Sequence, residues 1–194
     1  MTLHDFDSIY REFEPKIRRY LRHLVGENEA ADLTQVVFLK VSRGLASFRE
    51  EASLSTWIYR IATNTARDHV ASAATRQQER EQLLVAEEES LDDFPDRAAP
   101  GTDHAYVRRE MSACIRSIVD QLPESYRTVL LLGEFEGCSN PEIAAILDLR
   151  LETVKVRLHR ARARLRQALQ AQCSLYHDER NELMCDRKPI VVAK

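Results

Sequence analysis

The strongest constraint on the fold is the spacing of apolar residues, which recur every three or four positions along most of the chain. The first such series contains Ile9, Phe13, Ile17, Tyr20, Leu21 and Leu24. This spacing puts its members on one face of a helix. Only five glycines and six prolines punctuate the 194 residues, so helices can run for long stretches. The sequence therefore predicts an all-α protein.

Changes in composition divide the chain into four parts. Helical periodicity marks residues 1–74 and 104–171 as two small domains. Residues 75–103 between them are acidic and poor in large apolar groups, which predicts a flexible linker. Residues 172–194 form a tail that contains Cys and His and that neither domain requires.

Charge is sorted along the chain, although the net charge is only −3. From Ser139 to Gln170 there are seven Lys and Arg residues against three acids, whereas from Glu79 to Asp96 there are eight acids and one Arg. Binding to nucleic acid depends on basic residues that neutralise phosphates. The C-terminal basic segment is therefore a candidate nucleic-acid contact.

Two short helices joined by a tight turn are predicted in this basic segment. Ser139 and Glu142 have the spacing of a capping box before the first helix. A turn follows at 148–150, and Glu152 opens a second helix that should reach about Leu169. The pair is typical of a helix-turn-helix, whose second helix lies in the major groove of DNA. An isolated Arg-rich helix can equally be a solvated surface helix, but the capped helix and the turn favour DNA binding.

The helical wheel of this second helix separates a core stripe from a DNA-facing side. The stripe consists of Val154, Leu158, Ala161, Leu165 and Leu169. The opposite crest carries Glu152, Val156, His159 and Arg160, and the edges carry Lys155, Arg157, Arg162, Arg164 and Arg166. The first turns of a recognition helix reach base edges, and more distant basic residues contact phosphates. The candidates for base contacts are therefore Glu152, Thr153, Val156 and Arg160.

Longer stretches resemble the sigma-70 family, and its extracytoplasmic-function (ECF) sigma factors in particular. Residues 122–168 are similar to region 4 of that family, most specifically in the phrase ETVKVRLHRARARL. Region 2 is resembled by DLTQVVFLKV at 32–41 and FREEASLSTWIYRIATNTARDHV at 48–70. The resemblance covers most of residues 6–170 and implies a factor that lets RNA polymerase recognise and open promoters.

The resemblance also implies roles for particular residues. The clamp helices of the polymerase's largest subunit would contact Asp32, Gln35 and Lys40. The unpaired −10 promoter element would bind Phe48, Arg49, Ser53, Arg60, Asn64, Arg67 and Asp68. Region 4 would read the −35 element as duplex and contact the polymerase flap. Phe48 is the better candidate for base stacking, because Trp57 lies among apolar residues and is expected in the core.

Three positions depart from the family's usual pattern. Val36 stands where many members have an acid, Asp148 where glycine is frequent, and Val156 where a small polar residue is frequent. Asp accepts the left-handed backbone better than most residues, so Asp148 is compatible with the turn. Because of Val156, the promoter preference of relatives does not transfer to this chain.

The resemblance implies two further features of regulation. ECF factors are usually held inactive by an anti-sigma factor, so such a partner is expected. The family's linker threads the polymerase's active-site and RNA-exit path, so the acidic linker either stands in for RNA there or is a solvated tether. Docking would use Leu83, Leu84, Leu91 and Phe94.

The tail presents a possible metal site. Cys173, His177 and Cys185 lie close in sequence, and thiolate and imidazole are good zinc ligands. This spacing matches no standard zinc finger and supplies only three ligands. A zinc site, a redox pair and a docking tail with incidental cysteines remain open, and no other cofactor is expected.

Other function classes make distinct predictions. No apolar run is long enough to cross a bilayer and no secretory signal is present, so no membrane insertion and a cytoplasmic location are expected. No paired nucleophile and base, phosphate loop or complete metal site indicates an enzyme. The main alternative is a helix-turn-helix regulator that binds duplex DNA without a sigma role. Such a regulator needs no module from Asp32 to Val70.

Overall fold

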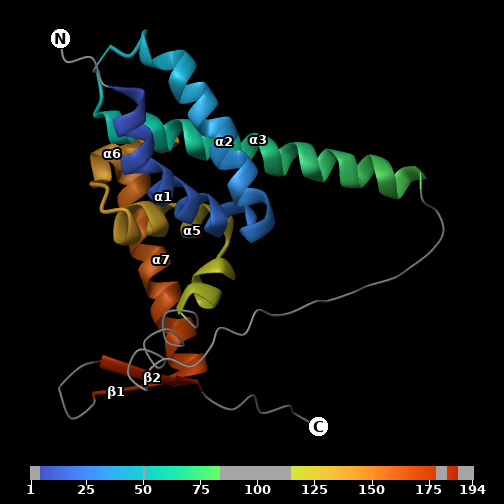
Figure 1. Cartoon of the computed structure of the whole chain (residues 1–194). Coiled ribbons are helices and arrows are strands. Elements are labelled where there is room, and N and C mark those ends of the chain that lie inside the picture. Colours follow the sequence, from blue (N-terminus) through green and yellow to red (C-terminus); the bar gives the residue numbers. More distant parts are fainter. Residues whose placement is uncertain (1–4, 50, 84–114, 178–182, 188–194) are drawn as a thin grey trace, which may run out of the picture.

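The computed structural model describes residues 5–49, 51–83, 115–177 and 183–187 (Figure 1). Helices dominate these ranges, and the all-α prediction is confirmed for both helical units. No helix in the described part of the chain is long and apolar enough to cross a membrane.

Three helices form the N-terminal unit: α1 (Phe6–Val25), α2 (Glu27–Leu45) and α3 (Leu54–Leu83). The apolar series of α1 faces the other two helices, and Ile17, Tyr20 and Leu21 are fully buried. Gly26 joins α1 directly to α2 with a φ of +93°. Glycine suits this position because L side chains rarely adopt a positive φ.

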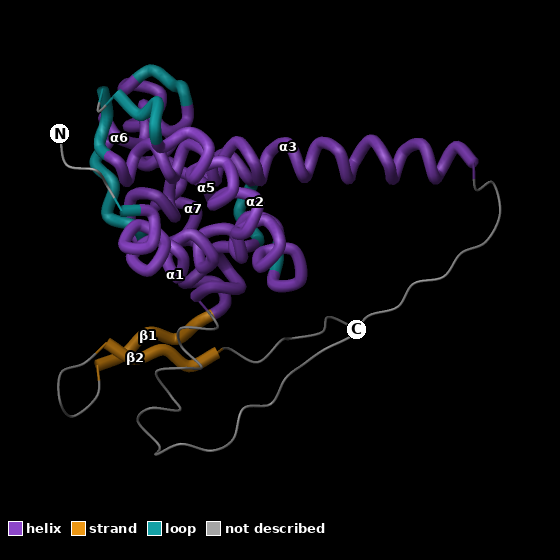
Figure 2. Tube along the Cα trace, turned by 45° about the horizontal axis from the view of Figure 1, so that its top comes forward, coloured by secondary structure: helices purple, strands orange, loops and turns teal. Residues whose placement is uncertain are grey.

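The long helix α3 extends away from the rest of the molecule (Figure 2). Directly before it, the Ser53 hydroxyl accepts a hydrogen bond from the Thr56 backbone N–H at 3.1 Å. Ser53 is therefore placed to cap a helix that starts at Leu54, as a side-chain oxygen does for orphan N–H groups. At its other end α3 reaches Leu83, so residues 75–83 of the expected linker are helical. Residues 84–103 lie outside the described residues.

The C-terminal unit contains α5 (Glu124–Leu130), the π-helical turn η1 (Leu131–Phe135), α6 (Asn140–Leu147) and α7 (Leu151–Gln172). The predicted capping box of α6 is confirmed. The Glu142 carboxylate accepts a hydrogen bond from the Ser139 backbone N–H at 2.8 Å, and the Ser139 hydroxyl accepts one from the Glu142 backbone N–H at 3.5 Å. Asp148 ends α6 with a φ of +53°, the left-handed conformation expected at this turn.

The tail contains an element that the sequence did not predict. Strands β1 (Cys173–His177) and β2 (Leu183–Arg187) pair antiparallel, with Leu175 opposite Cys185. β1 continues directly from α7 (Figure 1). Cys173 at this junction is buried against Ile118 and the end of α7.

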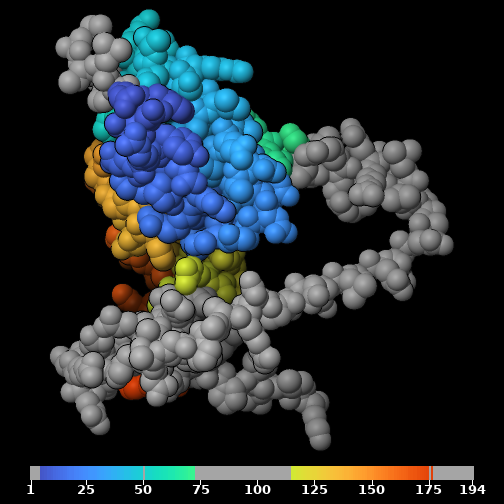
Figure 3. All heavy atoms as spheres, viewed as in Figure 1, coloured from blue at the N-terminus to red at the C-terminus, as the bar shows by residue number. Residues whose placement is uncertain are grey.

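The two helical units share one continuous apolar core. α6 packs against α3, and atoms of the C-terminal unit lie beside those of α1 on the face shown in Figure 3. Polar contacts join the units as well. Arg19 of α1 donates two hydrogen bonds of 2.9 Å to the carboxylate of Glu136, whose side chain is only 3% exposed. The Tyr59 hydroxyl of α3 donates to the same carboxylate.

Candidate nucleic-acid interface

The buried side of α7 follows the predicted stripe. Val154, Leu158 and Ala161 are buried, and Leu165 and Leu169 are half-buried. A Cβ built on Gly133 of η1 would lie 3.3 Å from the Leu158 Cδ2 atom. Gly133 therefore lets the second turn of α7 seat closely against η1, which fixes which residues of α7 face outward.

The opposite side of α7 is open to solvent in its first three turns. Glu152, Lys155, Val156, His159 and Arg160 are exposed, whereas Thr153 and Arg157 are half-buried. The predicted crest of the helix is therefore accessible as a continuous surface. Its spacing of three and four residues keeps these side chains on one face.

Two arginines at the edges of this surface are held by neighbouring side chains. Arg162 bonds the Glu134 carboxylate through Nε at 2.8 Å and Nη2 at 2.6 Å. The Arg164 guanidinium lies 4.9 Å from the centre of the Tyr126 ring. Neither partner was predicted from the sequence, because Glu134 in η1 and Tyr126 in α5 lie far from these arginines along the chain. These contacts orient both guanidinium groups before any DNA binds.

A second polar surface lies on α3. Arg60, Asn64, Arg67 and Asp68 are all exposed and are spaced four, three and one residues apart, so they share one side of the helix. Ile58, Tyr59, Ala62 and Ala66 on the other side are buried. The loop before α3 adds the exposed Arg49 and Ser53.

Phe48 and Trp57 form an aromatic pair beside this surface. The ring centres of Phe48 and Trp57 are 5.0 Å apart, and the ring planes are tilted by 35°. Trp57 packs against the core and lies so close to Gly44 that a Cβ there would be 2.8 Å from the indole Cζ2 atom. Phe48 therefore rests on an indole that is itself held against the core.

A third surface runs along α2 and combines polar and apolar side chains. Asp32, Gln35, Val36 and Leu39 are exposed at helical spacing, and we call them the α2 strip. In the sequence, the apolar residues between positions 33 and 41 predict one broad core face that includes Val36 and Leu39. For these two residues the prediction is wrong: Leu39 is 57% exposed and Val36 38%, whereas Val37 and Phe38 are buried. Lys40 is exposed, and its ammonium donates a hydrogen bond to the Thr65 hydroxyl at 2.9 Å, which ties it to α3.

Comparisons with known protein families identify both units. The model described as Sigma-70 region 2 matches residues 9–76, and the model described as Sigma-70, region 4 matches residues 112–165. The sigma-H factor of Pseudomonas aeruginosa is 34% identical over 166 residues, with 85% of this chain and 86% of the relative covered. This chain belongs to the sigma-70 family.

Further similarities place this sigma factor among the ECF type. The ECF sigma-E factor of Haemophilus influenzae is 31% identical over 85% of this chain and 87% of the relative. Among solved structures, the sigma factor RpoE of Bartonella quintana, in complex with the anti-sigma factor NepR, shares the fold. Its TM-score is 0.66 at 22% identity, with 86% of this chain and 97% of that chain covered. The region 2 match supports a sigma role and not a regulator that binds only duplex DNA.

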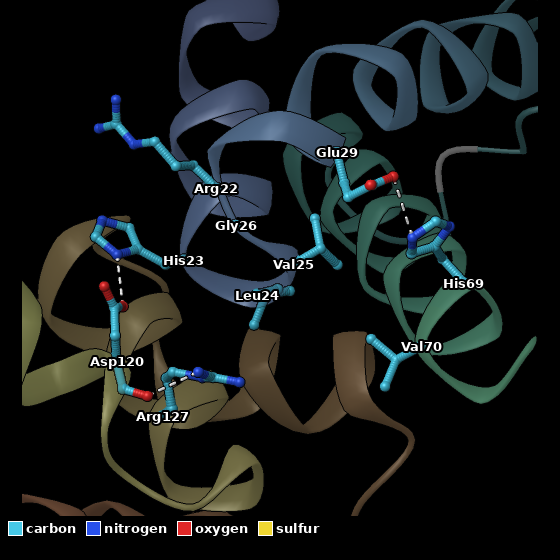
Figure 4. A pocket seen from close by; sticks show the side chains of 10 residues that line it. All are labelled: Arg22, His23, Leu24, Val25, Gly26, Glu29, His69, Val70, Asp120 and Arg127. Carbon is cyan, nitrogen blue, oxygen red and sulfur yellow. Dashed lines mark hydrogen bonds and ion pairs between the residues drawn. The ribbon is translucent and has the colours of Figure 1, made fainter. Parts of the chain in front are cut away.

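At the junction of regions 2 and 4 this sigma factor has an open pocket of about 490 Å³ (Figure 4). Asp120, which precedes α5, meets His23 of α1 with 2.9 Å between Oδ1 and Nδ1. On the region 2 side His69 Nε2 lies 3.4 Å from Glu29 Oε2. No partner of either histidine was predicted from the sequence. Their carboxylate partners lie far away in sequence, so spacing gave no signal.

Buried tyrosines and a thiol surround the polar contact between the regions. Burial raises the pKa of the Tyr59 hydroxyl, and its hydrogen bond to Glu136 raises it further. Burial likewise raises the pKa of the Cys138 thiol to about 11, with smaller contributions from Glu142 and Glu136. Both groups therefore stay protonated at neutral pH, and Tyr59 can serve as a hydrogen-bond donor to Glu136.

The possible metal site in the tail remains a prediction. The side chain of Cys173 is buried, and the side chains of His177 and Cys185 lie outside the described residues. Within the described part of this sigma factor, no three His, Cys, Asp or Glu residues are grouped so that they could hold a metal ion.

Proposed function

We propose that this ECF sigma factor divides promoter recognition among the three surfaces described above. α7 reads the −35 element as duplex, the exposed side of α3 and residues 48–53 hold the −10 element as single strand, and the α2 strip contacts the clamp helices of core polymerase. The observation that carries this proposal is the open basic side of α7, which lies opposite a stripe buried in the core.

On α7 the charged residues divide by position. Glu152, Thr153, Val156 and Arg160 occupy the first turns and contact bases. Lys155, Arg157, His159, Arg162 and Arg164 position the helix on the phosphates. Arg162 and Arg164 support this division, since Glu134 and Tyr126 already orient them at the edges of the surface. Positioning contacts supply affinity for any sequence, and base contacts supply the preference.

The proposed mechanism by which α3 helps to separate the two promoter strands requires no covalent step. A site that stacks and hydrogen-bonds unpaired bases shifts the strand equilibrium towards the open form, and each stacked base contributes about 1–3 kcal/mol. Phe48, backed by Trp57, supplies a stacking surface, and Arg49, Ser53, Arg60, Asn64, Arg67 and Asp68 supply polar groups. The factor therefore acts without a catalytic site.

Contact with polymerase is assigned to the α2 strip together with Lys40, and the flap is assigned to region 4. Two exposed apolar side chains beside Asp32 and Gln35 support this, since protein interfaces bury apolar groups at their centre and keep polar groups at their rim. The factor works in the cytoplasm, where core polymerase and promoter DNA are found.

Two further assignments extend this proposal. An anti-sigma factor holds the protein inactive, an expectation supported by its shared fold with an RpoE that was solved with its anti-sigma factor. In the tail, Cys173, His177 and Cys185 are the candidates for a zinc site that needs a fourth ligand, with a redox pair and a docking tail without metal as the alternatives. Metal analysis of the purified protein, with a Cys185→Ser variant as control, tests the zinc assignment.

Transcription in vitro with purified core polymerase tests the main proposal. Genomic fragments are transcribed with core enzyme alone, with the factor alone and with both, and run-off products are sequenced. We expect specific products only when both proteins are present. Arg160→Ala should lower transcription roughly ten-fold or more from a selected promoter by removing a base contact, while the exposed Arg11→Ala on α1 should leave it unchanged. Tight duplex binding without any transcript would overturn the proposal.

A further inference from the structure

One side chain on the open surface of α7 differs in kind from its neighbours. Val156 is 48% exposed and is the one large apolar side chain of this helix that is exposed. The apolar residues that flank it two positions away, Val154 and Leu158, are fully or almost fully buried. Val156 therefore contributes nothing to the core that its neighbours build.

The position of Val156 on the helix is well defined. Glu152 lies four residues before it and Arg160 four residues after it, so the three side chains line the crest of α7 in series. The close seating of Leu158 against Gly133 fixes the rotation of the helix about its axis. A helix placed in the major groove with this crest inward would bring Val156 against the base edges.

The major groove offers few partners to an aliphatic side chain. Its base edges present hydrogen-bond donors and acceptors at every pair, and the C5-methyl group of thymine is the apolar group among them. A charged or amide side chain gains nothing from this methyl group, whereas a valine contacts it without leaving a polar atom unsatisfied.

We propose that Val156 contacts the C5-methyl group of one thymine in the duplex element bound by α7, and thereby sets a base preference that Glu152 and Arg160 cannot supply. The proposal rests on the function proposed above for α7. Four residues of helix rise about 6 Å, and base pairs in duplex DNA are about 3.4 Å apart. The thymine therefore lies within about two base pairs of the base pair that Arg160 contacts.

Replacement of thymine by deoxyuridine tests the proposal directly, because this change removes the methyl group and leaves the hydrogen-bonding edges intact. Every thymine of the selected −35 element, on both strands, is replaced one at a time. Binding of the holoenzyme is then measured by competition at constant salt. For the wild-type protein we expect one position at which the substitution weakens binding by about three- to five-fold, the effect of one buried methyl group.

The Val156→Ala variant decides which side chain reads this methyl group. It should bind the unmodified promoter about three- to five-fold more weakly, and it should no longer distinguish thymine from deoxyuridine at the critical position. Val70→Ala is the matched control, because Val70 is a valine of similar exposure, 43%, on α3. The control should keep the full preference for thymine.

Several results would overturn the inference. They are a −35 element without thymine, a wild-type protein that is insensitive to every deoxyuridine, and a Val156→Ala variant that retains the preference. Each of these can occur while transcription itself remains specific and dependent on the factor, so the proposed function would stand. A complete lack of transcription with core polymerase would remove the proposed function, and this inference with it.

Discussion

Glu136 is the residue on which the contact between regions 2 and 4 depends most. Its buried carboxylate accepts hydrogen bonds from Arg19 and from Tyr59, on two different helices of region 2. A buried carboxylate is costly unless its oxygens are paired. Here the donors to the Glu136 carboxylate, a side chain of region 4, come from region 2.

Glu136→Ala should lower the free energy of unfolding by about 1–3 kcal/mol, because the Tyr59 hydroxyl loses its acceptor and the Arg19 guanidinium loses its partner. Urea denaturation followed by circular dichroism measures this change. Glu12→Ala is the control, since Glu12 forms an exposed ion pair with Lys16 on one helix and should cost less than about 0.5 kcal/mol. Equal effects of the two substitutions would contradict the role of Glu136.

Glu142 makes the capping box of α6 dependent on pH. Its hydrogen bonds from the Ser139 side chain and backbone lower the pKa of this carboxyl group from the ordinary value of 4.5. The stabilisation is therefore fully present above pH 4.5 and is lost as the pH falls through the lowered pKa. We expect the stability difference between wild type and Glu142→Gln to be largest at neutral pH and to shrink in acid. Urea titrations from neutral to acidic pH measure this stability difference. A difference that does not change with pH would contradict the role of the ionised Glu142 in the capping box.

At the scale of helices, sequence patterns predicted what is local and missed what depends on distant contacts. The capping box of Ser139 and Glu142, the left-handed Asp148 and the core stripe of α7 follow from spacings of a few residues. The contact between Arg19 and Glu136 joins positions 117 residues apart and leaves no mark in either local pattern. The strand pair at 173–187 also escaped prediction, because that tail has no apolar alternation clear enough to distinguish it.

The α2 strip shows a different limit. Apolar periodicity identifies residues that avoid water, but it does not say whether their partner belongs to the same chain. The periodicity therefore predicts that Val36 and Leu39 lie in the core, although in the structure they are exposed beside Asp32 and Gln35. Of the three surfaces, those on α3 and α7 are predominantly polar, and for α7 the helical wheel predicted which side of the helix is exposed.

Leu39→Ala should weaken binding to core polymerase about ten-fold or more if the α2 strip is the contact surface, because truncating a central apolar residue of an interface commonly costs more than 1 kcal/mol. Stability should change little, since Leu39 is largely exposed in the free protein. Binding is measured by competition for core enzyme against a labelled wild-type factor, and Val70→Ala serves as control. Unchanged affinity for Leu39→Ala would exclude the strip from the interface.

For the molecule as a whole, the packing of region 4 on region 2 conflicts with simultaneous reading of both promoter elements. Elements centred at −10 and −35 are about 25 base pairs apart, which is about 85 Å along duplex DNA. In the structure α6 packs directly against α3. If α3 and α7 bind these two elements as proposed, the two regions have to separate when a complete promoter is bound.

A distance measurement between the two regions tests this separation. Fluorophores are attached through non-natural amino acids at the exposed positions Ser42 on α2 and Gln167 on α7. Energy transfer should be high in the free protein and should fall when core polymerase and promoter DNA are added. An unchanged signal in an active holoenzyme would mean that the packed arrangement persists on the promoter.

Separation of the two regions would break the hydrogen bonds that Glu136 accepts from Arg19 and Tyr59. These bonds therefore oppose binding to polymerase, because they stabilise the packed form of the free factor. If only the separated form binds core enzyme, the apparent affinity falls in proportion to the fraction of molecules in that form, so whatever favours the packed form weakens binding. Loss of the Glu136 carboxylate should then make the factor less resistant to urea and, at the same time, a tighter ligand of polymerase. The Glu136 side chain would then increase the stability of the free factor and at the same time weaken the polymerase binding that transcription initiation requires.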